Sequence, residues 1–414
     1  MESLEIIALS ISSALATACG IGGGAVYSSF FFGIQEFEPS EAFPISNCII
    51  LLCGVVTFIN RILDKFENPK NKFVNYDIVI LFGPCMVMGT KIGTILNVVL
   101  NKLLLTIFLF VILLNSIFKN IRNIRKAKEK EEKYENELKL QERRGLSEPL
   151  LSKSHKKLSF NELIQNFDRG IVLTQEEKEL LKEEQMALQP RKILFMLGIE
   201  ILLIFDQFIE GNKNLSSLVG ITRCSISYWI VFSLYLVISF ILIIVGYRMA
   251  KSHLELTKRI TFGNTGLNEE KLSSSVYSMI FYAILAGIIS PMIGIGGGMI
   301  INPIFAGLGL DPKESSATSN FLIITTVISS TILFICSGQL NLTFTLILSV
   351  PCVICAFLGS VFILGYINRT KKSSFLLVMM AYIMVFSLLV LITKAYLDWN
   401  TIHFLDILTV NPYC

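Results

Sequence analysis

Residues 20–24 of this chain read GIGGG, and residues 294–298 read GIGGG again. Each motif interrupts an apolar stretch, 4–33 or 276–306, that is longer than the roughly 20 residues needed to cross a bilayer once. Glycines allow the backbone to leave the helical conformation. We therefore expect each stretch to be a broken or re-entrant helix.

The residues that follow the two motifs correspond as well. The matching pairs lie 274 residues apart, slipping to 273, and are Gly33 with Gly307, Glu38-Pro39 with Asp311-Pro312, and Ser46-Asn47 with Ser319-Asn320. A further echo is GPC at 83–85 against VPC at 350–352. Correspondence at a fixed separation indicates an internal duplication. The sequence thus predicts two related units, each with four apolar segments.

The composition places most of the chain in a membrane. Of its 414 residues, 53% are apolar and 16% are charged, which excludes a water-soluble globular domain. We predict an all-α polytopic membrane protein of the plasma membrane or an endomembrane, in which two linking helices join the two repeats. The expected ten hydrophobic segments are 4–33, 43–60, 76–100, 102–121, 193–210, 224–247, 276–306, 316–337, 341–366 and 373–396.

Charged residues are concentrated in one segment. Residues 122–190 contain 15 Lys/Arg and 14 Asp/Glu and have no sustained apolar heptad. We expect a solvated, partly helical cytosolic loop that offers a surface for a protein partner. The predicted organisation is a first transmembrane repeat at 1–121, this charged loop at 122–190, a linking helix pair with a cytosolic loop at 191–274, a second transmembrane repeat at 275–396 and a C-terminal tail at 397–414.

Basic residues favour one orientation of the repeats. If both glycine-interrupted stretches are hairpins, every Lys/Arg cluster faces the cytosol, and the two repeats are inverted relative to each other. The alternative of ten plain crossings with parallel repeats misplaces only the short turn with Arg369, Lys371 and Lys372. We favour the inverted arrangement, which is typical of secondary transporters.

The glycine motifs are candidates for binding an anion. Where a glycine break opens a helix, free backbone N–H groups and the helix dipole favour negative charge. The alternative is that small residues only allow close helix packing. Because the motif is duplicated, we favour a binding site, whose candidate residues are Gly22, Gly23, Gly24, Gly296, Gly297 and Gly298.

Three polar side chains extend this candidate substrate site. Asn47 and Asn320 follow the motifs in corresponding positions, and their amides could donate hydrogen bonds either to an anion or to carbonyls of other helices. The adjacent Ser46 and Ser319 fit caps or interhelical bonds better. Lys91 lies deep in an apolar segment and is a candidate substrate charge; pairing with Glu200 or Asp206 is the structural alternative.

Other functional classes have little support. Eight cysteines lie in or beside apolar runs, so we interpret them as packing residues and not as a disulfide framework. The three histidines lie in polar or terminal stretches and indicate no metal site or catalytic triad. The net charge of +4 is too scattered for a nucleic-acid partner. We expect neither an enzyme nor a cofactor.

The doubled GIGGG with its downstream Gly, acid-Pro and Ser-Asn resembles the sulfite exporter TauE/SafE family of membrane anion transporters. The resemblance covers roughly 1–121 and 190–396. It implies alternating-access transport of sulfur-containing anions such as sulfite or sulfonates, with a proton or another ion as coupling ion. The chain departs from the pattern in its charged insert and in having Ser28-Ser29 where the second repeat has Asn302-Pro303. A non-transporting scaffold or receptor-like subunit that keeps the fold is the alternative.

Overall fold

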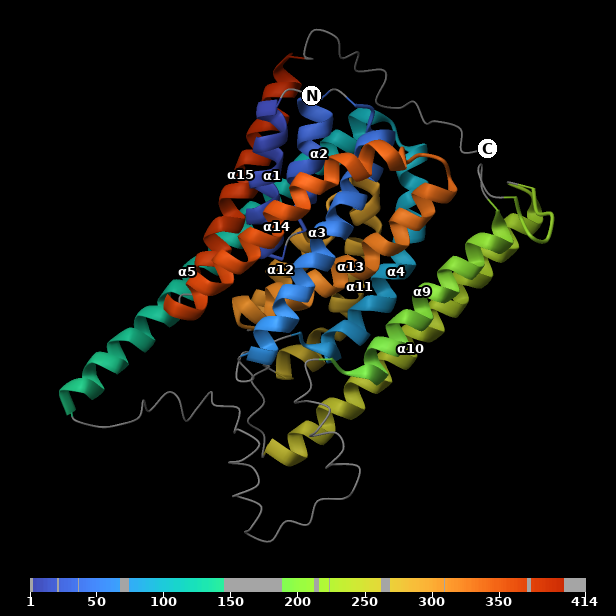
Figure 1. The fold of residues 1–414 in the computed structure, drawn as a ribbon. Coiled ribbons are helices and arrows are strands. Elements are labelled where there is room, and N and C mark those ends of the chain that lie inside the picture. The colour runs from blue at the N-terminus through green and yellow to red at the C-terminus, as the bar shows by residue number, and fades with distance from the viewer. Residues whose placement is uncertain are drawn as a thin grey trace.

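The computed structural model of the protein describes residues 3–20, 22–35, 37–67, 74–144, 188–211, 216–222, 224–261, 269–308, 310–370 and 374–397. Most of the predicted charged loop, 145–187, and the predicted tail from 398 onward lie outside these residues. The described part contains 12 helices (Figure 1). Seven of them are long and apolar enough to cross a membrane, which confirms the expected all-α polytopic membrane protein.

The helices fall into two sets of five with a pair between them. The first set is α1 (Ser3–Ala18), α2 (Gly24–Gly33), α3 (Pro39–Glu67), α4 (Tyr76–Val99) and α5 (Lys102–Arg144). The second set is α11 (Glu269–Ile293), α12 (Gly298–Gly307), α13 (Pro312–Cys336), α14 (Leu342–Thr370) and α15 (Ser374–Leu397). The linking pair is α9 (Pro190–Glu210) and α10 (Ile226–Thr261), which lie side by side at one edge of the bundle in Figure 1.

Both glycine-rich stretches are broken helices, as predicted. The first consists of α1 and α2 and the second of α11 and α12; the short helices α2 and α12 both have 10 residues. In Figure 1, α1 and α2 lie in the upper part of the bundle, whereas α12 lies in the lower part; α11 runs along the length of α4. The short helices α2 and α12 thus lie toward opposite ends of the bundle.

The breaks depend on left-handed backbone conformations. Gly22 and Gly23 have φ of 82° and 80°, and Gly296 and Gly297 have φ of 71° and 72°. A residue with a Cβ pays about 1–2 kcal/mol in this region, whereas glycine adopts it freely. The repeated glycines are therefore required by the chain path as well as by close packing.

The broken helices of each half pack mainly against helices of the other half. Helix α1 packs along α14 of the other half, and α11 packs along α4; likewise α2 contacts α15 and α12 contacts α5. Helices α3 and α13, one from each half, also pack against each other. Each broken helix is thus held mainly by helices of the opposite half, and the two halves form one interlocked bundle.

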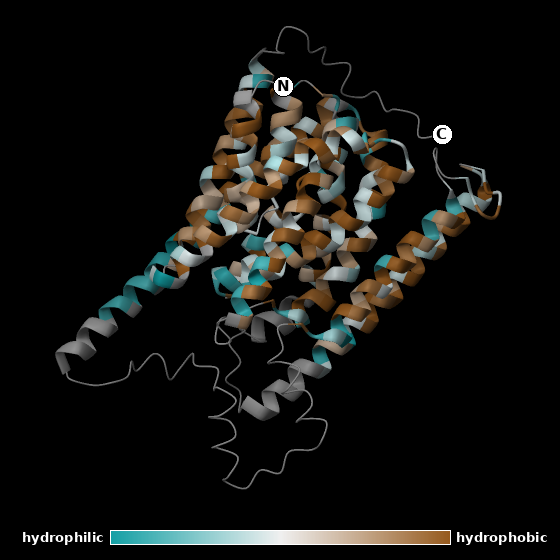
Figure 2. Ribbon diagram, viewed as in Figure 1, coloured by the Kyte–Doolittle hydropathy of each residue, from teal (hydrophilic) through white to brown (hydrophobic). Residues whose placement is uncertain are grey.

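Hydropathy follows this packing. Figure 2 shows apolar residues over most of the bundle and hydrophilic residues toward the far end of α5. That helix continues to Arg144, so the segment predicted as a charged loop begins as a helix. Near its middle, Glu131 accepts hydrogen bonds from the backbone N (2.8 Å) and the Oγ (2.6 Å) of Ser374, at the start of α15.

One expectation about the cysteines is wrong. Cys224, in the connection between α9 and α10, is disulfide-bonded. The sequence places it next to an apolar segment, and nothing in its neighbours identifies a distant partner. The free cysteines of the described residues are Cys19, Cys48, Cys53, Cys85, Cys336, Cys352 and Cys355.

Candidate functional site

The second glycine break is held by side chains of the first half. The backbone carbonyl of Gly294 accepts hydrogen bonds from Ser28 Oγ at 2.9 Å and from Ser46 Oγ at 2.8 Å. Both serines are almost completely buried. A carbonyl released by a helix break inside a membrane must find another donor, and α2 and α3 provide two.

The first break is held in the same way by the second half. The carbonyl of Gly20 accepts from Asn302 Nδ2 at 2.8 Å and from Ser319 Oγ at 2.6 Å. Gly20 and Gly294 correspond in the repeat, as do Ser46 and Ser319. The predicted interhelical role of the two serines is confirmed. The sequence difference between Ser28 and Asn302 also has an explanation, since both side chains donate to the opposite break.

The structure brings the two glycine motifs together. A Cβ built on Gly22 would lie 3.0 Å from Ile50 Cγ2 and 3.1 Å from Ile323 Cγ2. A Cβ on Gly296 would lie 3.3 Å from Ile323 and 3.4 Å from Ile50. A Cβ on Gly24 would meet the carbonyl of Gly294. Both isoleucines are fully buried, so the motifs meet on a sealed apolar contact between α3 and α13.

Two helix N-termini open at this meeting point. Gly23 is the N-cap of α2 and Gly297 that of α12, and neither helix has a side-chain cap bond there. Glycine has no side chain to accept from the first-turn N–H groups, so the positive dipole ends at Gly24 and Gly298 are not capped by the N-cap residue itself. All six predicted glycines lie at these two breaks.

The two candidate asparagines differ in their bonding. Asn320 Nδ2 donates to the carbonyl of Gly54 at 3.2 Å, which is the interhelical bond weighed as the alternative for this residue. Asn47 is fully buried, and within the described chain neither its Nδ2 nor its Oδ1 has a hydrogen-bond partner. In the repeat, Gly54 corresponds to Val327. Because Gly54 has no side chain, the amide of Asn320 can reach its carbonyl. Asn47 would have to reach the carbonyl of Val327 in the same way, and the valine side chain stands in its path.

A buried cation near the first break was not predicted. Arg61 is 3% exposed, and its Nη2 donates to the Ala18 carbonyl at 2.7 Å and to Ser316 Oγ at 2.7 Å. Its Nε is buried without a hydrogen-bond partner among the described residues. The expectation that every Lys/Arg cluster faces the cytosol puts Arg61 on that face together with Lys65, Lys70 and Lys72. Its helical spacing from Asn47, Ile50 and Gly54, however, places it on the same face of α3, which is the signal that could have found it.

Lys91 lies in a different environment. Its Nζ donates to the Asp206 carboxylate and to Glu210 Oε1, the latter at 2.7 Å, and lies 4.4 Å from the centre of the Tyr235 ring. The predicted alternative of pairing with Asp206 is thus observed. Glu200 is not the second partner, because it accepts from Ser329 Oγ at 2.6 Å.

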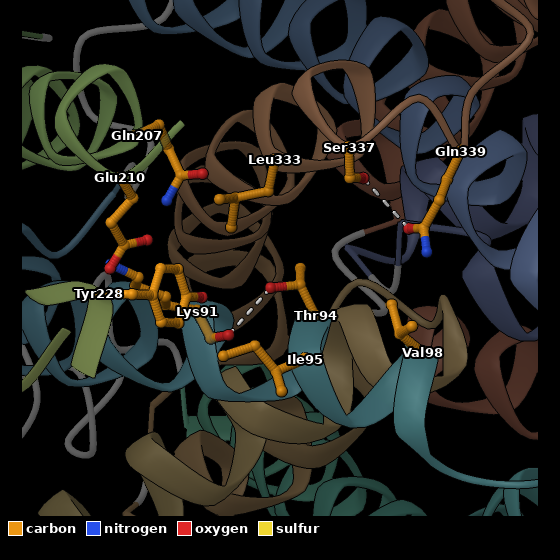
Figure 3. A pocket seen from close by; sticks show the side chains of 10 residues that line it. All are labelled: Lys91, Thr94, Ile95, Val98, Gln207, Glu210, Tyr228, Leu333, Ser337 and Gln339. Carbon is orange, nitrogen blue, oxygen red and sulfur yellow. Dashed lines mark hydrogen bonds and ion pairs between the residues drawn. The ribbon is translucent and has the colours of Figure 1, made fainter. Parts of the chain in front are cut away.

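A small cavity opens beside Lys91, as Figure 3 shows. It has a volume of about 30 Å³ and is also lined by Glu210, Gln207 and Tyr228. No residue of either glycine motif lines it. The structure therefore groups the candidate residues into two places: the glycines and asparagines between α3 and α13, and Lys91 beside α9 and α10.

Comparison with known proteins identifies relatives along the chain. Residues 216–391 match the family model described as Sulfite exporter TauE/SafE. Sulfite exporter TauE/SafE family protein 5 of Arabidopsis thaliana is 23% identical over 397 residues, covering 94% of this chain and 82% of that protein. Family protein 1 of the same organism is 25% identical over 410 residues, covering 96% and 84%. No solved structure gives a significant match. The chain is therefore related over almost its whole length to the sulfite exporter TauE/SafE family, as the doubled glycine motif suggested.

Proposed function

We propose that this protein is a secondary transporter that exports or exchanges small sulfur-containing anions, such as sulfite or sulfonates, by alternating access. The observation that carries the proposal is the crossed bonding of the two breaks. Each break is capped by serine or asparagine of the other half, and the unpartnered amide of Asn47 lies one helical turn from Ile50, where the motifs meet. The relatives are named as sulfite exporter TauE/SafE family proteins, in agreement with this proposal.

The chemistry of this centre suits an anion. The helix starts at Gly23 and Gly297 present N–H groups, and Asn47 adds an amide that no protein group satisfies in the described chain. Arg61 contributes a buried positive charge whose hydrogen bonds go to a carbonyl and a hydroxyl, not to a carboxylate. A buried charge is costly, and an arriving anion would offset part of that cost.

The arrangement also suggests how access alternates. Ile50 and Ile323 close the centre, and the two breaks beside them lead into α2 and α12, which lie toward opposite ends of the bundle. Opening one set of crossed bonds while keeping the other would expose the anion to one side at a time. The disulfide-bonded Cys224 favours an oxidising, non-cytosolic side for the connection between α9 and α10, in agreement with the cytosolic placement predicted for 122–190.

Flux measurements test the proposal directly. The purified full chain is reconstituted in liposomes, and uptake of radiolabelled sulfite, sulfate, thiosulfate and taurine is followed. We expect saturable uptake of at least one sulfur-containing anion. Uptake of none of them, by a protein that is inserted and folded, would contradict transport and favour the scaffold or receptor-like alternative.

The role of Arg61 is tested in the same assay. Replacing Arg61 by Met removes the charge but keeps much of the buried stem, so we expect the KM for the anion to rise by about 10-fold or more, equivalent to about 1.4 kcal/mol. Lys at this position keeps the charge and should restore part of the affinity. An unchanged KM in the Met variant would leave Arg61 only as a cap on the end of α1.

A further inference from the structure

The cluster around Lys91 lies apart from the proposed anion centre and has a charge of the wrong sign for an anion. Lys91, Asp206 and Glu210 are 2%, 7% and 4% exposed. One ammonium faces two carboxylates, so the three groups carry a net negative charge when all are ionised. A site of this kind attracts a cation and repels sulfite.

The two carboxylates have different surroundings. Asp206 is bonded to Lys91 but does not line the cavity, so it serves as the counter-ion of the ammonium. Glu210 bonds to the same ammonium and also lines the cavity of about 30 Å³, which has room for a water molecule. Figure 3 shows Glu210 and Lys91 on the same wall of that cavity. Glu210 is therefore the excess carboxylate that can exchange a proton with water.

A further acid on α9 adds to the excess of carboxyl groups over ammonium groups in this region. Glu200 is buried, accepts one hydroxyl bond from Ser329, and has an Oε1 without a hydrogen-bond partner in the described chain. Together with Asp206 and Glu210 it gives the inward side of α9 three carboxyl groups. Titratable side chains at the cluster come from α4, α9 and α10 and are Lys91, Glu200, Asp206, Glu210, Tyr228 and Tyr235; α13 contributes Ser329, Leu333 and Ser337, which do not titrate.

The cluster is mechanically connected to the second glycine break. Gly89 and Gly93 lie on either side of Lys91 in α4, and a Cβ on them would collide with the carbonyls of Ile284 and Ile288 in α11. Such close backbone packing makes α4 and α11 move together. Helix α11 leads directly into the break at Gly294. A change of charge at Lys91 can thus reach the anion centre through two tightly packed helices.

We propose that Glu210, held by Lys91 beside Asp206, binds the proton that is coupled to anion transport; this inference rests on the proposed transport function. When the site is loaded, a proton from cavity water forms an O–H bond with the Glu210 carboxylate, and the cluster becomes neutral. When it is unloaded, that bond breaks and the proton returns to water. Lys91 remains an ammonium and Asp206 a carboxylate throughout.

The test compares net flux with exchange. Wild type and Glu210→Gln are reconstituted in liposomes, and sulfite uptake is measured with and without a pH gradient. A gradient of about one unit can drive about tenfold accumulation of an anion that moves with one proton. We expect this accumulation in wild type and its loss in Glu210→Gln, while sulfite–sulfite exchange continues because it requires no net proton movement. Both proteins meet the same sulfite–bisulfite equilibrium, so a difference between them comes from the protein.

A matched control lies at the other end of α9. Lys192 Nζ forms an ion pair with Asp77 Oδ1 at 2.5 Å, so Asp77→Asn neutralises an acid of the same kind away from the cavity, and its response to the gradient should equal that of wild type. If Glu210→Gln does not insert, wild-type accumulation is measured with a protonophore, which should abolish it.

Three results decide the matter. The proton site is overturned if wild type exchanges sulfite but does not respond to the pH gradient, or if Glu210→Gln responds as wild type does. In either case the proposed transport function still stands. Absence of both exchange and net flux in wild type overturns the transport function, and the proton site with it.

Discussion

The two halves of the molecule share a frame but differ in their polar chemistry. Both have a glycine break whose carbonyl is capped from across the bundle by serine or asparagine. The first half has Arg61 buried beside the break, Lys91 buried in α4, and at Asn47 an amide without a partner in the described chain; Asn320, which corresponds to Asn47, is bonded to Gly54. Duplication thus accounts for the path of the chain, whereas we assign binding to positions where the halves differ and coupling to Glu210 of the linking pair, held by Lys91.

The strongest test of the common frame is to substitute the N-cap glycines. Gly23→Val and Gly297→Val place a branched side chain at φ of 80° and 72°, where a Cβ would also lie 2.8 Å from the Tyr27 ring or 3.1 Å from Met86 Cε. We expect both variants to lose sulfite flux, with Gly23→Val also the less stable because the ring is less able to move than a methionine end.

Gly307→Ala is the control for these variants, since a Cβ there meets nothing within 4 Å. The sulfite flux of all three variants is compared in liposomes that contain equal amounts of inserted protein. Normal transport by either valine variant would mean that its break serves only packing.

The second test addresses the buried charge of Lys91 in α4. Lys91→Met leaves Asp206 and Glu210 buried without their cation, and we expect a loss of about 3–5 kcal/mol of stability. The midpoint of thermal unfolding in detergent measures this, and adding Asp206→Asn should restore part of the loss. If Lys91→Met is stable and only the affinity for the anion falls, the original prediction of a substrate charge at Lys91 is favoured.

The third test separates the two asparagines. Asn320→Ala removes the bond to the Gly54 carbonyl and should cost about 1 kcal/mol of stability with little change in KM. Asn47→Ala removes an amide with no hydrogen-bond partner in the described chain, so we expect unchanged or slightly higher stability and a higher KM for the anion. Unfolding midpoints and KM values of both variants are compared, and the reverse pattern would place the anion nearer to Asn320.

The smallest effect is expected from the charged loop. Deletion of 146–186 should leave flux and stability unchanged, because the segment has near-balanced charge and no apolar periodicity. Deletion of 128–186 also removes Glu131, which caps α15 through Ser374, and should cost about 1 kcal/mol more. Unfolding midpoints of the two deletions show the difference; a loss of flux in the shorter deletion would mean that the loop contributes to transport.

Much of the frame is predictable because its signals are local. Apolar runs locate the helices, and glycines at φ near 80° locate the break before α2. Contacts between helices that are distant in the sequence leave no such local signal. The sequence around Arg61 does not indicate that its side chain bonds to Ala18 and Ser316, and the sequence around Cys224 does not indicate its disulfide partner. The same limit applies to Lys91: its apolar segment suggests Glu200 or Asp206 as a partner, but does not indicate Glu210, one turn beyond Asp206.

The crossed caps have a consequence for biosynthesis. Gly20 is synthesised early, but the residues that donate hydrogen bonds to its carbonyl, Asn302 and Ser319, are synthesised almost 300 residues later. Until then the nascent first half carries an unsatisfied carbonyl in lipid, which is costly, so its broken helix cannot settle permanently on its own. Such long-range completion slows folding and leaves intermediates exposed. The first half must therefore wait in the membrane, open or assisted, until the second half has been synthesised and the two breaks can close on each other.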